Sequence, residues 1–242
     1  MNDFNRSYAA PSREMSTAVN AGLRSFMLGV YNKMALGLAL TAILAFAVGT
    51  NEQLTMTLLT PPLFYVVAFG PIAILLLSAF VMKNPSPMAA NLVYWSVVSL
   101  IGVGMGSIVY VYGNMPNGMM LVAKAFFTTS AAFAALSLWG YTTKRDLSGW
   151  GVFLFMGVIG LVVAMVINMF IASSIMSLVI SVIGLLIFAG LTAYDTQRLK
   201  EMYFQIQGNT RAMSVATTYG ALSLYINFVN MFQFILSLMS SD

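Results

Sequence analysis

The chain has 242 residues, of which 60% are hydrophobic and 7% are charged, and its mean hydropathy is +0.86. Because a soluble globular domain carries about 25% charged residues, this composition cannot cover a water-facing surface. The net charge is +4, but no clustered basic face with interleaved aromatic residues accompanies it, so we expect no nucleic-acid partner.

The hydrophobic residues are gathered into seven long stretches that follow a polar segment. Residues 1–25 are too hydrophilic for a signal peptide, and we expect them to form a cytosolic N-terminal tail. Each apolar stretch is long enough to cross the hydrocarbon core of about 30 Å as a helix. The stretches cover residues 27–49, 62–82, 88–112, 119–141, 150–171, 174–195 and 217–238. Residues 26–242 are therefore expected to form a single all-α transmembrane domain of seven helices.

The connections between the spans are short, and most contain turn residues such as Pro, Gly and Asn. The break at residues 172–174 is required because its absence would create a span of about 45 residues, longer than a tilted helix in a bilayer allows. Residues 196–216 are expected to form the longest internal loop. In the third span, Gly102 and Gly106 make a G-x-x-x-G pattern, which predicts close packing of two helix backbones.

The basic residues indicate the orientation, because Lys and Arg near the ends of spans stay on the cytoplasmic side. Those outside the spans all fall on one side of the predicted topology: Arg6, Arg13, Arg24, Lys83, Lys144, Arg145, Arg198, Lys200 and Arg211. We therefore predict a cytoplasmic N-terminus and an external C-terminus. Two lysines lie within spans, and we expect Lys33 to snorkel to the inner surface and Lys124 to the outer one.

Asp195, at the cytoplasmic end of the sixth span, is the acidic residue of most interest. An ionisable residue within a span costs about 2.5 to 3.5 kcal/mol on insertion scales, so it needs a partner, water or access to the interface. In one interpretation Asp195 is an interfacial carboxylate, bonded to its own helix or paired with Arg198. In the other it faces the bundle interior, where its protonation would alter packing or ion passage.

The seventh span carries a stripe of polar residues along related helical faces: Ser223, Asn227, Asn230 and Gln233. The stripe predicts a buried central helix. It has two interpretations: the side chains form hydrogen bonds between membrane helices, or they line a wet path accessible to ions.

Several short motifs together resemble the transmembrane Bax-inhibitor-motif family, also called the Bax inhibitor one family. The motifs are AYDTQR at residues 193–198, SLYINF at 223–228, VYNKM at 30–34 and GYTTKRDLSG at 140–149. The last of these resembles a turn of the bacterial branch. The resemblance covers residues 25–238, and it implies a fold in which six helices surround a central seventh.

The resemblance also implies a function, because family members are described as pH-sensitive calcium leak channels. In them an aspartate ending the sixth span shares a proton with one in the seventh, and a basic residue ending the second span pairs with the first aspartate. Asp195 matches the first aspartate, and Lys83 falls where the basic partner belongs. Asn227 occupies the place of the second. Since an aspartate beside a neutral amide titrates only once, the resemblance implies an altered sensor.

Our leading hypothesis is therefore a calcium leak protein whose closed state is stabilised by Asp195 with Asn227 and Lys83. Asn230 and Arg198 would be supporting polar residues. We expect no cofactor, with calcium or protons as the transported ions and the lipid bilayer as the surroundings. The bacterial-type turn favours a bacterial inner membrane. The alternative is an interaction protein that uses its polar tail to bind another membrane protein, such as a quality-control protease.

Enzymatic functions are disfavoured by the residues that the chain lacks. There is no Cys and no His, which removes thiolate nucleophiles, the Ser and His pair of a rhomboid-like protease, and the commonest zinc ligands. An intramembrane aspartyl protease needs two aspartates within its spans, and Asp195 has no such partner. A retinal protein needs a lysine in its seventh span, where none occurs. We expect a protein that is not an enzyme.

Overall fold

The computed structural model describes residues 13–240, with side chains from Asn20 onward, so Arg6 and the first half of the predicted tail lie outside the described residues. Every regular element of the described chain is a helix. The helices are α1 (Arg13–Gly49), α2 (Glu52–Leu59), α3 (Leu63–Val81), α4 (Pro87–Gly113), α5 (Gly118–Thr142), α6 (Ser148–Ile171), α7 (Ser174–Ile206) and α8 (Thr210–Met239). Seven of them, all except α2, are long and apolar enough to cross a membrane. The prediction of an all-α membrane protein with seven spans is confirmed.

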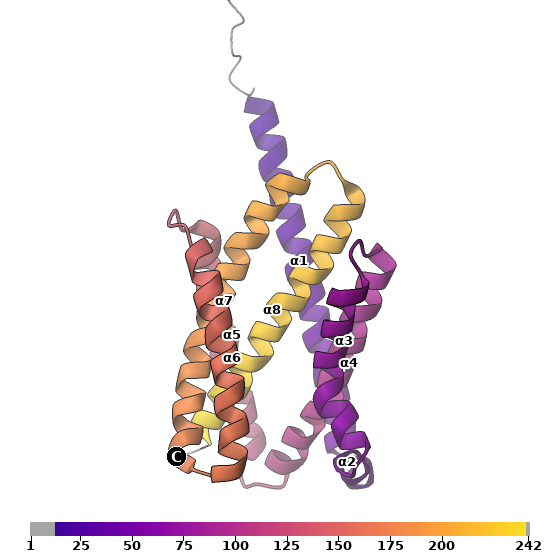
Figure 1. The fold of residues 1–242 in the computed structure, drawn as a ribbon, viewed down its shortest axis with the longest axis vertical. Helices are drawn as coiled ribbons and strands as arrows, with labels where there is room; N and C mark the ends of the chain where they lie inside the picture. Colours follow the sequence, from indigo (N-terminus) through magenta and orange to yellow (C-terminus); the bar gives the residue numbers. More distant parts are fainter. Residues whose placement is uncertain (1–12, 241–242) are drawn as a thin grey trace, which may run out of the picture.

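The last helix, α8, runs through the middle of the bundle (Figure 1). Buried residues make up 61% of an apolar stretch of 18 residues in α8, the highest share among the seven spans. It packs against α1, α4, α5 and α7, whereas α3 packs on α4 and α6 packs on α7. The central position of α8 agrees with the polar stripe in its sequence.

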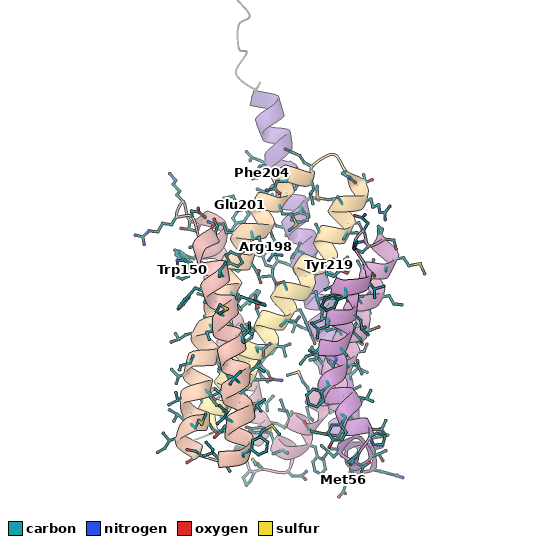
Figure 2. All side chains as sticks on the ribbon, in the orientation of Figure 1. Met56, Trp150, Arg198, Glu201, Phe204 and Tyr219 are labelled. Carbon is teal, nitrogen blue, oxygen red and sulfur yellow. The ribbon has the colours of Figure 1, made fainter. Side chains whose placement is uncertain are left out.

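The outer surface of the bundle is apolar. Phe80 on α3 is 78% exposed and Phe170 on α6 is 85% exposed, which only a lipid environment accommodates at low cost. The start of α1 and the α3–α4, α5–α6 and α7–α8 connections lie at one end of the bundle, which we call the basic end. Figure 2 shows Arg198 and Glu201 towards this end and Met56 at the opposite one.

The connection at residues 50–61, for which no element was predicted, contains the short helix α2. Asn51 caps α2, its side-chain oxygen accepting a hydrogen bond from the backbone N–H of Leu54 at 3.1 Å. Thr55 is 1% exposed and donates to the carbonyl of Val48 at 2.9 Å. The short helix is therefore held against the end of α1.

The prediction of a long loop at residues 196–216 is wrong, since α7 continues to Ile206 and α8 begins at Thr210. The extension of α7 buries Leu199 and Tyr203, and the ring of Tyr203 lies 5.8 Å from that of Phe26 on α1. Residues 13–25, which we assigned to the tail, form the first part of α1. Helices α1 and α7 thus pack against each other beyond the apolar stretches from which the spans were predicted.

The G-x-x-x-G pattern of α4 packs closely against α1, as predicted. A Cβ atom on Gly102 would lie 3.0 Å from the Cα atom of Thr41, and one on Gly106 would overlap the side chain of Val48. A larger residue at Gly106 would force Val48 to shift, and one at Gly102 would press tightly against the α1 backbone. The two glycines therefore allow the α1 and α4 backbones to meet.

Candidate functional site

Asp195 on α7 faces the central helix and is 5% exposed. Its Oδ2 atom accepts two hydrogen bonds from α8, one from the Ser223 hydroxyl at 2.5 Å and one from the Asn227 amide at 2.8 Å. Ser223 and Asn227 are four residues apart and so share one face of α8. We call Asp195, Ser223 and Asn227 the Asp195 cluster.

Arg198 supplies the positive charge beside this carboxylate. Its Nη1 atom lies 3.7 Å from Asp195 Oδ1, one helical turn further along α7, and its side chain is 53% exposed. An exposed ion pair of this kind contributes about 0 to 1 kcal/mol, whereas a hydrogen bond to a charged group contributes about 1.5 to 3 kcal/mol. The two bonds from α8 therefore dominate the stabilisation of the ionised carboxylate.

Lys83 is not brought to Asp195. It follows the end of α3 as an exposed residue, and α3 packs on α2 and α4 at the edge of the bundle, away from α7. Within the described residues, the ion pair of Asp195 is the one with Arg198. The cation that the cluster uses thus comes from the same helix as the carboxylate.

The remaining polar residues of α8 do not join the cluster. The Asn230 amide donates to the carbonyl of Ile226 on its own helix at 2.8 Å, and Gln233 is exposed. Of the predicted stripe, Ser223 and Asn227 are the residues that link α8 to Asp195. The four-residue spacing of Ser223 and Asn227 is the sequence signal that pairs them.

Lys33 belongs to a second polar group, on the other side of α8. Its Nζ atom donates to Asn91 Oδ1 on α4 and to the Thr218 hydroxyl on α8, the latter at 2.7 Å, and it lies 5.6 Å from the centre of the Tyr94 ring. Lys33 is therefore held by side chains of two other helices, which the snorkelling prediction did not include. Its ammonium group is satisfied by three neighbouring side chains within the bundle, while Lys124 is exposed.

Hydroxyl groups make three further hydrogen bonds between helices that the sequence did not reveal. Tyr31 on α1 shares a hydrogen bond of 2.5 Å with Ser137 on α5, and Ser137 shares one of 2.9 Å with Thr196 on α7. Thr41 on α1 shares one of 2.6 Å with Tyr225 on α8. Side-chain hydrogen bonds of this kind join membrane helices, so these three bonds hold α1 to α5, α5 to α7 and α1 to α8.

The chemistry available to the Asp195 cluster is that of one carboxylate with neutral donors. Calcium takes six to eight oxygen ligands, commonly from several carboxylates. Among the described residues, no group of three or more acidic, His or Cys side chains is placed to hold a metal ion. The geometry therefore fits a reversible contact between two helices better than a resident metal site.

Comparisons with known proteins agree with this architecture. Residues 23–242 match the family model described as inhibitor of apoptosis-promoting Bax1. An uncharacterized protein of Caulobacter vibrioides is 49% identical over 98% of this chain and 97% of its own length. The inner membrane protein YbhL of Escherichia coli is 35% identical over 93% of this chain and 95% of its own. The chain therefore belongs to the Bax inhibitor family and is an integral, multipass membrane protein.

Proposed function

We propose that this chain is a cation leak channel, with calcium as its ion, whose closed state is held by the Asp195 cluster. The observation that carries the proposal is the buried carboxylate of Asp195, bonded to two side chains of the central helix. A carboxylate in a span is costly to retain, so a role in an ion pathway or a gate is the default hypothesis for it. The resemblance to the Bax inhibitor family, whose members are described as pH-sensitive calcium leak channels, favours the same role.

The cluster would act by joining α7 to α8. The two hydrogen bonds to the charged carboxylate together favour the closed arrangement by a few kcal/mol, since each contributes about 1.5 to 3 kcal/mol. Asn227 stands where the resemblance places a second aspartate, so closure here needs no shared proton. We therefore propose a leak that depends on pH less steeply than one controlled by two carboxylates.

We also propose a location and an orientation. The name of the Escherichia coli relative, an inner membrane protein, supports the bacterial inner membrane for this chain. The basic end would face the cytoplasm, because Lys and Arg are retained there. The N-terminus would then be cytoplasmic and the C-terminus external.

The test is passive calcium flux into liposomes that contain purified protein, comparing the wild-type chain with Asp195→Asn. We expect a higher flux in the variant, because its neutral side chain holds Ser223 and Asn227 less strongly. Glu201→Gln is the matched control, since it removes an exposed carboxylate from the same helix and should leave the flux unchanged. Equal flux in wild type and Asp195→Asn would contradict the proposed role of the cluster.

A second candidate function is the binding of another membrane protein, such as a quality-control protease. The first turns of α1 extend beyond the rest of the bundle at the basic end (Figure 1), which favours a docking helix. Its test is deletion of residues 2–22 followed by co-purification. Loss of a partner that the full chain retains would support the candidate, and an unchanged set of partners would contradict it.

A further inference from the structure

A hollow lies between α1 and α5 in the half of the bundle nearest the basic end. Its volume is about 680 Å³, within the range of about 300 to 1,000 Å³ that ligand pockets have. Its lining includes Arg24, Leu28 and Tyr31 of α1, with Phe133, Leu138 and Tyr141 of α5. We call it the α1–α5 hollow.

The depth of the α1–α5 hollow offers an apolar wall. Met27 and Phe133 are 4% and 7% exposed, and the hydroxyl groups of Tyr31 and Ser137 bond to each other. Ser137 is bonded to Thr196 as well. Because these polar atoms already have partners, the inner wall favours a hydrocarbon chain over a polar ligand.

The rim of the hollow faces the surroundings of the bundle. Leu28 and Leu138, one from each wall, are 50% and 64% exposed. Arg24 and Tyr31 are seven residues apart on α1, which corresponds to a depth of about 10 Å at about 1.5 Å per residue. One leaflet contributes about 15 Å to the hydrocarbon core, so the hollow lies within the depth of a single leaflet.

Two cations flank the end of the hollow that is nearest the membrane surface. Arg24 is exposed on α1, and Lys200 of α7 donates to the carbonyl of Tyr141 at 2.9 Å, with its Nζ atom 5.3 Å from the centre of that ring. Among the side chains that the structure describes, no carboxylate lies within ion-pair distance of either cation. The positive charge at this end is therefore not neutralised by the described protein residues.

We infer that the α1–α5 hollow binds an anionic phospholipid of the leaflet at the basic end. The phosphate lies between Arg24 and Lys200, and one acyl chain runs inward along Met27 and Phe133. A cationic mouth above an apolar wall is complementary to this class of lipid in both charge and shape. The inference does not depend on the leak function, because the hollow lies on the opposite side of α1 from the Lys33 group and no residue of the Asp195 cluster lines it.

The test is native mass spectrometry of the full chain released from detergent after incubation with phosphatidylglycerol or phosphatidylcholine. We expect preferential retention of phosphatidylglycerol. Arg24→Gln should weaken that retention about tenfold, the loss expected for one charge-assisted contact of about 1.4 kcal/mol. Arg145→Gln is the charge-matched control, an exposed arginine at the same end that does not line the hollow, and it should change little.

A second variant tests the hydrocarbon part of the site. Ala134 lines the hollow and is itself exposed, so Ala134→Trp should fill the space without disturbing the core, and it should reduce retention of phosphatidylglycerol. Val152→Trp, on the exposed face of α6, is the size-matched control. Equal retention of the two lipids, or equal losses in the variants and their controls, would overturn the inference.

Discussion

The replacement of Asn227 by Asp is the most informative change at the candidate site. In the wild-type chain the Asn227 amide donates to Asp195 at 2.8 Å, and both side chains are buried. In the variant a second carboxylate takes the place of that donor. Two carboxylates in contact cannot both ionise without repulsion, so we expect the pair to share one proton and to titrate in two separate steps.

The size of the effect follows from the separation of the charges. Two unit charges about 4 Å apart repel by about 4 kcal/mol at an effective dielectric constant of about 20. Since one pH unit corresponds to about 1.4 kcal/mol, the two steps should be separated by about 3 pH units. The second proton is then lost at a higher pH than the first, because its loss creates the repulsion. We therefore expect Asn227→Asp to be less stable than the wild type at about pH 8 and to recover as the pH falls towards about pH 5.

Thermal unfolding in detergent, followed by circular dichroism across that pH range, measures this effect. Asn230→Asp is the matched control, because it adds a carboxylate to the same helix at a residue bonded to its own backbone. We expect the unfolding temperature of Asn227→Asp to rise on acidification more than that of Asn230→Asp or the wild type. Identical pH profiles for the two variants would refute the proposed contact between residues 195 and 227.

Three further predictions concern the fold. Gly106→Ala should destabilise the chain by about 1 to 3 kcal/mol through overlap with Val48, whereas Gly113→Ala, at a site with open space, should not; thermal unfolding distinguishes them. Asn91→Leu should cost about 1 to 2 kcal/mol, because the ammonium of Lys33 loses an acceptor, and no loss in chemical unfolding would argue against that bond. The hydroxyl and backbone N–H of Ser148 hold the pKa of Asp146 below its ordinary value. While Asp146 is ionised, these bonds slow backbone hydrogen exchange at the start of α6. The slowing is therefore fully present above the ordinary pKa of an aspartate and is lost as the pH falls through the lowered pKa of Asp146. Asp146→Asn should remove this acid dependence, which hydrogen-exchange measurements at the start of α6 would detect.

The spans could be predicted from the sequence because about 20 consecutive apolar residues have few alternatives to a membrane helix. The run of apolar residues ends at the bilayer surface, which is why residues 196–216 were expected to form a loop. Their helical continuation depends on Tyr203 packing against Phe26, a contact between residues far apart in the chain. The short helix α2 was missed for a similar reason, since eight residues carry too little periodicity to be distinguished from a loop.

The candidate site could be predicted only in part. The motifs around Asp195 and Asn227 placed these residues on facing helices, and the structure brings them together. The position of Lys83 depends on where α3 packs, which hydropathy does not report. Lys33 shows the same limitation, because its acceptors Asn91 and Thr218 come from two other helices. A polar residue in a span signals that a partner is needed without indicating which helix supplies it.

Passive calcium flux through the wild-type chain in liposomes, measured between about pH 5 and about pH 8, tests the central claim most directly. The leak proposal predicts a flux above that of protein-free liposomes, with a shallow pH dependence because the cluster holds a single carboxylate. The absence of flux at every pH, from protein shown to be folded and inserted, would contradict the proposal and favour the binding of a membrane partner.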